Sequence, residues 1–279
     1  QYLMDIITEI AAKYNIDYNR VVIAGFSMGG IGAYHQALRL NDRLSAVMAS
    51  AGSWSLGTWD GLKNMPMYLI HGVSDAYHNS SGCRPHNTAI EYARLAHQSL
   101  YKASTIHKLY EYPAGHAWDA SGELYWKNFI SGQQGWVTDK VRNPYRSNVT
   151  AVNPWRSYDT GNNFGVTWTE KPSPHTMWVS IKQTGTGTIP YDYAKETGTG
   201  GCSSASDFNN WSLSLTTMNM PGGKAEANIT GQNQIVVTSA NVTKMSLWLH
   251  PGMVNFNKPV NVTLNGVSKS YMLNASLLT

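Results

Sequence analysis

The chain has 279 residues, which is enough for one large domain or two ordinary ones and for a sizeable buried core. A hydrophobic share of 42% excludes a disordered chain, and a charged share of 14% is well below the roughly 25% of an average soluble protein. The net charge of +4 comes without any run of Lys or Arg, so nucleic-acid binding is not predicted. The sequence contains no stretch of about 18 apolar residues, so no membrane span is predicted. Low charge combined with many Ser, Thr, Asn and Gly residues favours a secreted or cell-surface protein.

The first half of the chain alternates helix and strand patterns. Helices are predicted at residues 2–14, 28–40, 87–102 and 122–132, where apolar residues recur on one helical face. Strands are predicted at residues 21–24, 44–51, 67–71 and 107–112. Strands separated by helices are typical of a parallel sheet covered by those helices, so the fold class is α/β.

The second half has a different character, and no helix is predicted after residue 135. Short alternating runs indicate strands at residues 177–181, 225–229, 234–238, 244–249, 260–264 and 270–273. The pair Asn265-Gly266 between two such runs is a strong signal for a hairpin turn. We therefore expect two domains, at residues 1–142 and 143–279, the second an antiparallel β-sandwich.

The sequence Gly25-Phe26-Ser27-Met28-Gly29 matches the G-x-S-x-G pattern of a nucleophile elbow. A predicted strand precedes it and a predicted helix follows, as this sharp turn requires. The two glycines that flank the turn are expected to provide the space it needs, and Gly30 and Gly32 to let the helix pack closely on the sheet. The pattern predicts Ser27 as a nucleophile, with the backbone N–H of Met28 as the first donor of an oxyanion hole.

A serine nucleophile needs a general base that a third group holds in place. In α/β-hydrolases these groups follow the serine in the order acid, then histidine. Asp75 lies just past the strand at residues 67–71, and His116 lies in the loop after the strand at residues 107–112. Asp60 and Glu91 are alternatives for the acid, but neither directly follows a strand.

Residues 23–30, 71–75 and 115–118 together resemble the dienelactone-hydrolase, esterase and prolyl-oligopeptidase branch of the α/β-hydrolases. The resemblance extends to about residue 132 and implies a Ser-Asp-His triad. Residues 142–145 and 247–262 are more weakly similar to C-terminal β-domains of large secreted hydrolases in this branch. The family has several strands before the helix at residues 2–14. We therefore expect a fragment, or a processed chain paired with its own N-terminal segment, rather than a reduced sheet that folds alone.

The sequence leaves open the roles of several aromatic residues, of the two cysteines and of the glycosylation sequons. Trp54, Trp59, Tyr77 and Trp118 follow predicted strands near the triad and could form a substrate pocket, although core packing explains them equally well. Cys83 and Cys202 either form a disulfide or remain two unpaired thiols. Asn-x-Ser/Thr sequons, which would be glycosylated only in a eukaryotic secretory pathway, begin at Asn79, Asn148, Asn210, Asn228, Asn241, Asn261 and Asn274.

The leading functional hypothesis is hydrolysis of a small-molecule or polymer-linked ester by an acyl-serine mechanism. Ser27 would attack, His116 would transfer the proton and Asp75 would orient His116; no metal and no cofactor is predicted. The alternatives are a prolyl-oligopeptidase-type serine peptidase and a structural or carbohydrate-binding protein. The last hypothesis relies on sugar stacking by tryptophans of the second half, some of which core packing would also explain: Trp155, Trp168, Trp178, Trp211 and Trp248.

Overall fold

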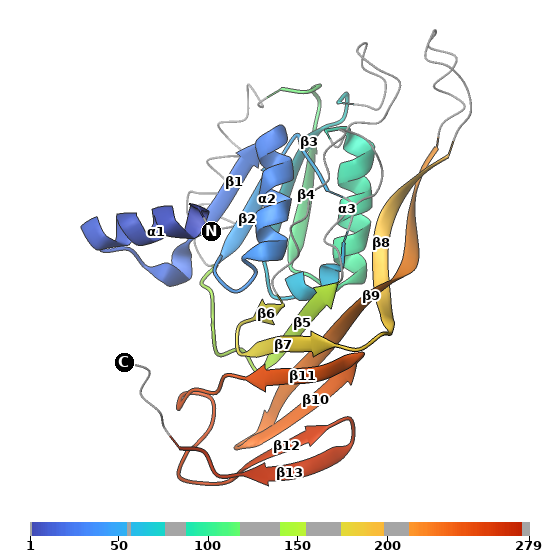
Figure 1. Cartoon of the computed structure of the whole chain (residues 1–279). Coiled ribbons are helices and arrows are strands. Elements are labelled where there is room, and N and C mark those ends of the chain that lie inside the picture. Colours follow the sequence, from blue (N-terminus) through green and yellow to red (C-terminus); the bar gives the residue numbers. More distant parts are fainter. Residues whose placement is uncertain are drawn as a thin grey trace.

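A computed structural model describes residues 2–54, 57–75, 88–117, 140–154, 174–197 and 212–274 (Figure 1). Within these ranges an α/β unit lies above a group of antiparallel and mixed β-sheets. Several sequence predictions lie outside the described residues: the helix at residues 122–132, Tyr77, Trp118, Cys83, Cys202, Trp155, Trp168 and Trp211.

The α/β unit is built on a four-stranded parallel sheet with the order β1-β2-β3-β4. The strands are β1 (Val22–Phe26), β2 (Ala46–Ser50), β3 (Met67–Gly72) and β4 (His107–Tyr112). The helices are α1 (Tyr2–Lys13), α2 (Met28–Arg39) and α3 (Ile90–Lys102), with short 3-10 turns η1 (Tyr18–Arg20) and η2 (Trp59–Leu62). None of the helices in the described ranges is long and apolar enough to cross a membrane.

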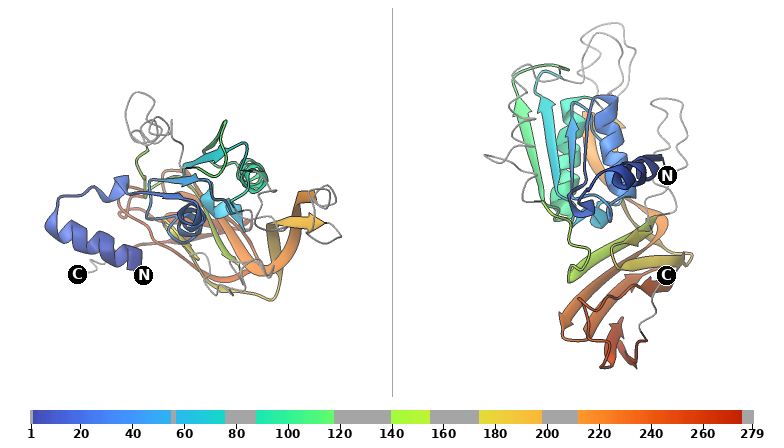
Figure 2. Two further views of the ribbon diagram at one scale, coloured as in Figure 1. Left: turned by 90° about the horizontal axis from the view of Figure 1, so that it is seen from above. Right: turned by 90° about the vertical axis from the view of Figure 1, so that its left-hand side faces the viewer.

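Helices α2 and α3 lie on one face of this sheet, as Figure 2 shows in its right-hand view. Both β2 and β3 are buried along their whole length, which suits strands covered on both faces. Tyr34 of α2 and Leu100 of α3 pack with Val47 and Leu69 of the sheet in one buried cluster. Strand β1 pairs with β2 alone among the described strands, so within the described residues it forms an edge of this sheet.

The second half of the chain forms two sheets. The strands are β5 (Asn148–Pro154), β6 (His175–Thr176), β7 (Val179–Thr184), β8 (Thr188–Thr197), β9 (Ser212–Gly231), β10 (Gln234–Ala240), β11 (Val242–Leu247), β12 (Val260–Leu264) and β13 (Val267–Tyr271). The six-stranded sheet has the order β13-β12-β10-β9-β5, with β8 also paired to β9, and the three-stranded sheet has the order β11-β7-β6.

One pairing differs from the expected antiparallel pattern, because β10 and β12 are parallel. After β10 the chain crosses to the smaller sheet as β11, and it returns to the larger sheet at β12. The predicted hairpin at Asn265-Gly266 is present between β12 and β13, and both turn residues have positive φ, 46° and 84°.

The two sheets share an apolar core, to which Ala227 of β9, Ile235 of β10 and Ile181 of β7 contribute. Trp178 is also buried there and donates its indole N–H to the carbonyl of Arg146 at 2.8 Å, so it is a core residue. Trp248 is half exposed, and the ammonium of Lys182 lies 5.3 Å from the centre of its ring.

The hairpin of β8 and β9 connects the two halves of the molecule, and Figure 1 shows it alongside α3. Tyr191 of β8 belongs to the buried cluster of the α/β unit. Asp192 exchanges two backbone hydrogen bonds with Gly57, at 2.9 and 3.0 Å, and its carboxylate accepts a 2.8 Å bond from Lys102 of α3. The α/β unit and the hairpin therefore pack as one body, although the boundary at residues 142–143 stays a sequence prediction.

We expect Asn233→Ala to lower the free energy of unfolding by about 3 kcal/mol. Asn233 has φ of 58°, which alanine adopts poorly, and its amide donates to the carbonyls of Asn255, Lys258 and Pro259 at 2.7, 3.1 and 3.2 Å. Urea denaturation measures the loss. Asn233→Gly, which keeps the backbone conformation, should recover only part of it, and equal stability of Asn233→Ala and the unmodified chain would contradict this account.

Candidate active site

Ser27 occupies a sharp turn between β1 and α2, as the motif predicts. Its φ of 56° and ψ of −120° are sparsely populated for a residue with a side chain. The turn is held from both sides, because the Ser27 N–H donates to the Ser50 carbonyl at 2.8 Å and the Ser27 carbonyl accepts from Ile31 at 3.1 Å. Such strained residues persist where the surroundings hold them, and they cluster at functional sites.

The glycines of the motif have unequal roles. A Cβ at Gly25 would lie 2.0 Å from the Gly29 carbonyl oxygen, and one at Gly30 would lie 2.7 Å from the Ser50 oxygen. Both positions therefore require glycine for a close approach of α2 to the sheet. At Gly29 and Gly32 a Cβ would meet nothing within 4 Å. The expectations that the turn needs a small residue at Gly29, and helix packing a small residue at Gly32, are therefore wrong.

A further glycine, just past the end of β2, supports the same turn. A Cβ at Gly52 would lie 2.0 Å from the Ser27 carbonyl oxygen and 3.0 Å from the Ile31 nitrogen. Gly52 follows Ala51, whose own φ is 46°. The need for glycine at position 52 could not be predicted from the sequence, because no local motif links Gly52 to a serine 25 positions earlier.

The structure brings the three predicted triad residues together. Ser27 Oγ lies 2.8 Å from Nε2 of His116, and Nδ1 of His116 lies 2.8 Å from Oδ2 of Asp75. A carboxylate only accepts hydrogen bonds, so Nδ1 carries the proton and Nε2 is left to accept the hydrogen of the Ser27 hydroxyl. This arrangement allows the imidazole to remove the hydroxyl proton.

Burial differs along this line of residues. The side chain of Asp75 is 2% exposed, whereas that of His116 is 34% exposed. The carboxylate is held in the interior, and the imidazole reaches the surface where a substrate could meet Ser27. A buried carboxylate is costly unless hydrogen bonds satisfy it.

His71 is a second contact of the Asp75 carboxylate. It lies on β3, is 1% exposed, and its Nε2 is 3.1 Å from Asp75 Oδ2. The same nitrogen is 2.6 Å from the carbonyl oxygen of Thr88, and since a carbonyl only accepts, Nε2 carries a hydrogen. The contacts of His71 are those of a group that positions Asp75.

An ion pair lies next to His71 in the sheet, because His71 of β3 and Glu111 of β4 are partners in register. Arg94 of α3 donates two hydrogen bonds to the Glu111 carboxylate, at 2.8 and 2.7 Å. These bonds hold the pKa of Glu111 below its ordinary value, although burial acts in the opposite direction. Glu111 therefore keeps its negative charge at neutral pH beside the buried His71.

The loop that carries His116 is held in place by its neighbours. The Tyr112 hydroxyl, at the end of β4, donates to the Ala117 carbonyl at 2.6 Å, and the Ser74 N–H donates to the Ala114 carbonyl at 2.9 Å. The ring of Phe26 lies 5.3 Å from that of His116. Phe26 and Tyr112 were not identified as site residues from the sequence, because an aromatic residue at a strand end carries no specific signal.

Met28 and the aromatic candidates occupy different environments. As the first residue of α2, Met28 has a backbone N–H without an acceptor inside the helix, beside Ser27. Trp54 is 4% exposed with its ring 4.1 Å from that of His35, and Trp59 is 2% exposed against Tyr34. The burial of both tryptophans favours core packing over a role as pocket walls.

The parallel sheet and the serine at a strand–helix turn are features of an α/β-hydrolase-like fold. Residues 1–110 match the family model described as Phospholipase/Carboxylesterase. This match confirms the prediction of an α/β-hydrolase for the first part of the chain.

Among curated proteins, the chain is similar to the bifunctional acetylxylan esterase/xylanase XynS20E of Neocallimastix patriciarum. The two are 32% identical over 75 residues, which are 27% of this chain and 11% of the relative. The match therefore spans only about a tenth of that protein.

Similar solved structures include three further chains. A thermostable esterase is 24% identical with a TM-score of 0.40, over 50% of this chain and 36% of that chain. Esterase PE8 is 21% identical with a TM-score of 0.37, over 46% and 57%. SOBER1 of Arabidopsis thaliana is 20% identical with a TM-score of 0.37, over 46% and 60%.

Proposed function

We propose that this protein is a serine hydrolase that cleaves carboxylic esters through an acyl-serine intermediate. The observation that carries the proposal is the continuous contact from Ser27 Oγ through His116 to Asp75, with 2.8 Å at each step. The match to the phospholipase/carboxylesterase family supports ester bonds as the target. A hydroxyl is a weak nucleophile at neutral pH, and this line of contacts is what activates it.

In the acylation half of the reaction, His116 Nε2 takes the proton of Ser27 as Oγ attacks the ester carbonyl. The carbonyl oxygen becomes negatively charged, and the Met28 N–H at the start of α2 would stabilise it. Collapse of this intermediate breaks the ester C–O bond, and His116 returns its proton to the departing alcohol.

In the deacylation half, His116 takes a proton from water, and the resulting hydroxide attacks the acyl-serine. The acid product leaves as Ser27 recovers its proton. Throughout, Asp75 keeps the Nδ1–H of His116 facing its carboxylate and stabilises the imidazolium that forms twice per turnover. His71, whose Nε2 also bonds to the Thr88 carbonyl, keeps Asp75 in the position that this requires.

We propose short acyl esters as substrates, in small molecules or linked to a polymer. The polymer-linked esters are suggested by the name of the relative, a bifunctional acetylxylan esterase/xylanase. We further propose that residues 143–279 form a β-sandwich accessory domain of a secreted or cell-surface protein. Two sheets with a common core support the first statement, and the low charge content supports the second.

Labelling by a fluorophosphonate tests the proposal directly. We expect the full chain to be labelled at Ser27 and to hydrolyse p-nitrophenyl acetate, because the probe reacts with activated serines. Ser27→Ala should lose labelling and lower kcat by at least about 10³-fold. Ser268→Ala, on the exposed strand β13, should behave like the unmodified chain.

The outcome also separates the competing functions. Absence of labelling in the folded chain would contradict the hydrolase proposal and favour a structural or binding role. Faster cleavage of a dipeptidyl p-nitroanilide than of p-nitrophenyl acetate, with the same Ser27 dependence, would assign a peptidase instead.

A further inference from the structure

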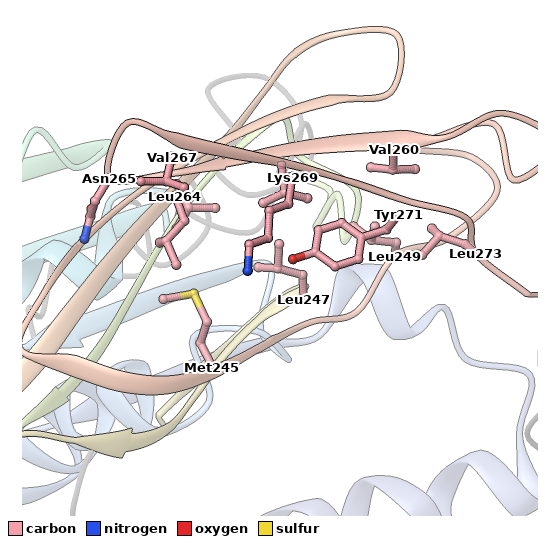
Figure 3. A pocket seen from close by; sticks show the side chains of 12 residues that line it. Met245, Leu247, Leu249, Val260, Leu264, Asn265, Val267, Lys269, Tyr271 and Leu273 are labelled. Carbon is pink, nitrogen blue, oxygen red and sulfur yellow. The ribbon is translucent and has the colours of Figure 1, made fainter.

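An apolar pocket lies in the second half of the chain, between β11 and the hairpin of β12 and β13 (Figure 3). Its volume is about 650 Å³, within the usual range for sites that bind small molecules. The pocket is distinct from the candidate active site, because Ser27 follows β1 at one end of the molecule and β12 and β13 lie at the other (Figure 1).

The pocket exists because the larger sheet extends beyond the edge of the smaller one. Val262 of β12 and Lys269 of β13 are partners in register, so alternate residues of both strands face the same side. Met245 and Leu247 of β11 lie across from Lys269 (Figure 3). The floor of the pocket is therefore aliphatic. Leu264 on this floor is 40% exposed, so a bound ligand could remove its apolar surface from water.

Two polar side chains point into this aliphatic pocket. The ammonium of Lys269 and the hydroxyl of Tyr271 approach the same space above Leu247 (Figure 3). Within the part of the chain that the structure describes, neither has a hydrogen-bond or ion-pair partner. The amide of Asn265, also in the lining, is occupied by Ser239, to which it is bonded at 2.8 and 3.3 Å.

We propose that this pocket binds an aliphatic carboxylate of medium chain length. The alkyl chain would cover the floor formed by Leu247, Val262 and Leu264, and the carboxylate would accept hydrogen bonds from Lys269 and Tyr271. Charge-assisted bonds of this kind are about twice as strong as neutral ones. A neutral sugar fits poorly, because the lining has one aromatic ring and two free donors among many aliphatic groups.

Calorimetric titration of the full chain with sodium decanoate, below its micelle concentration, tests the proposal. We expect saturable binding that Lys269→Met weakens by about tenfold and Tyr271→Phe by a few fold. Decanol, which has the same chain without the charge, should bind more weakly than decanoate and should be insensitive to Lys269→Met. Lys244→Met is the matched control, because Lys244 of β11 does not line the pocket.

Several outcomes would overturn the assignment. These are absence of decanoate binding, equal binding of decanol and decanoate, and binding that Lys269→Met leaves unchanged. Binding of a neutral oligosaccharide at the pocket would assign a sugar instead. A concentration-dependent dimer that Leu264→Lys dissociates would assign a second copy of the chain. Repeating the titration with Ser27→Ala keeps the result independent of the hydrolase proposal.

Discussion

Asp75→Asn should lower kcat for p-nitrophenyl acetate by about 10³- to 10⁴-fold while the protein stays folded. Asp75 accepts the Nδ1–H of His116, and this leaves Nε2 free to accept the Ser27 hydroxyl proton. An amide in place of the carboxylate can donate to Nδ1, so the proton moves to Nε2. The imidazole then presents a hydrogen to Ser27 and can no longer act as the base.

Steady-state kinetics and the rate of fluorophosphonate labelling should both report this loss, with circular dichroism as the check on folding. Asp60→Asn is the matched control, because Asp60 was the other carboxylate that the sequence offered. Its carboxylate is 41% exposed and pairs with Lys224 at 2.8 Å, away from His116. If Asp75→Asn kept full activity, or if Asp60→Asn lost as much, the assignment of the acid would be wrong.

The proximity of Ser27, Asp75 and His116 could be predicted because the position of each depends on local pattern and chain order. Ser27 is marked by a motif, and Asp75 and His116 each follow a strand that its own sequence defines. The strand at residues 107–112 is found at the predicted bounds. Parallel strands end at one edge of a sheet, so residues that follow them meet there without any further information.

The features that the sequence did not reveal depend on contacts between distant residues. Gly52 is needed because the Ser27 carbonyl lies against it, and the β8 strand was missed although Tyr191 packs into the α/β core. The parallel pairing of β10 with β12 follows from a crossover between sheets. Local propensity cannot anticipate such contacts, because they arise only when the whole chain is folded.

Aromatic residues show the same limit. Trp54 follows a predicted strand, and Trp178 and Trp248 both lie within predicted strands, so the sequence pattern does not separate them. The structure buries Trp54 and Trp178 and leaves Trp248 half exposed. Whether an aromatic ring packs or meets a ligand is set by the elements that cover it, and no spacing rule carries that information.

Gly52→Ala should destabilise the protein by about 3 kcal/mol and abolish labelling of Ser27. A Cβ at this position would lie 2.0 Å from the Ser27 carbonyl oxygen, and backbone atoms on both sides prevent an easy adjustment. Relief of the overlap must move the Ser27 turn away from β2. That movement would break the 2.8 Å bond between the Ser27 N–H and the Ser50 carbonyl and misplace Oγ relative to His116.

Gly32→Ala provides the contrast, because a Cβ there meets nothing within 4 Å inside the helix α2. Alanine is favoured over glycine in a helix by about 0.5–1 kcal/mol, so this variant should be slightly more stable and should label normally. Urea denaturation and fluorophosphonate labelling of both variants measure the difference. Equal stability and equal labelling of the two would show that contact with Gly52 does not hold the turn, and the strained conformation of Ser27 would then need a different source of support.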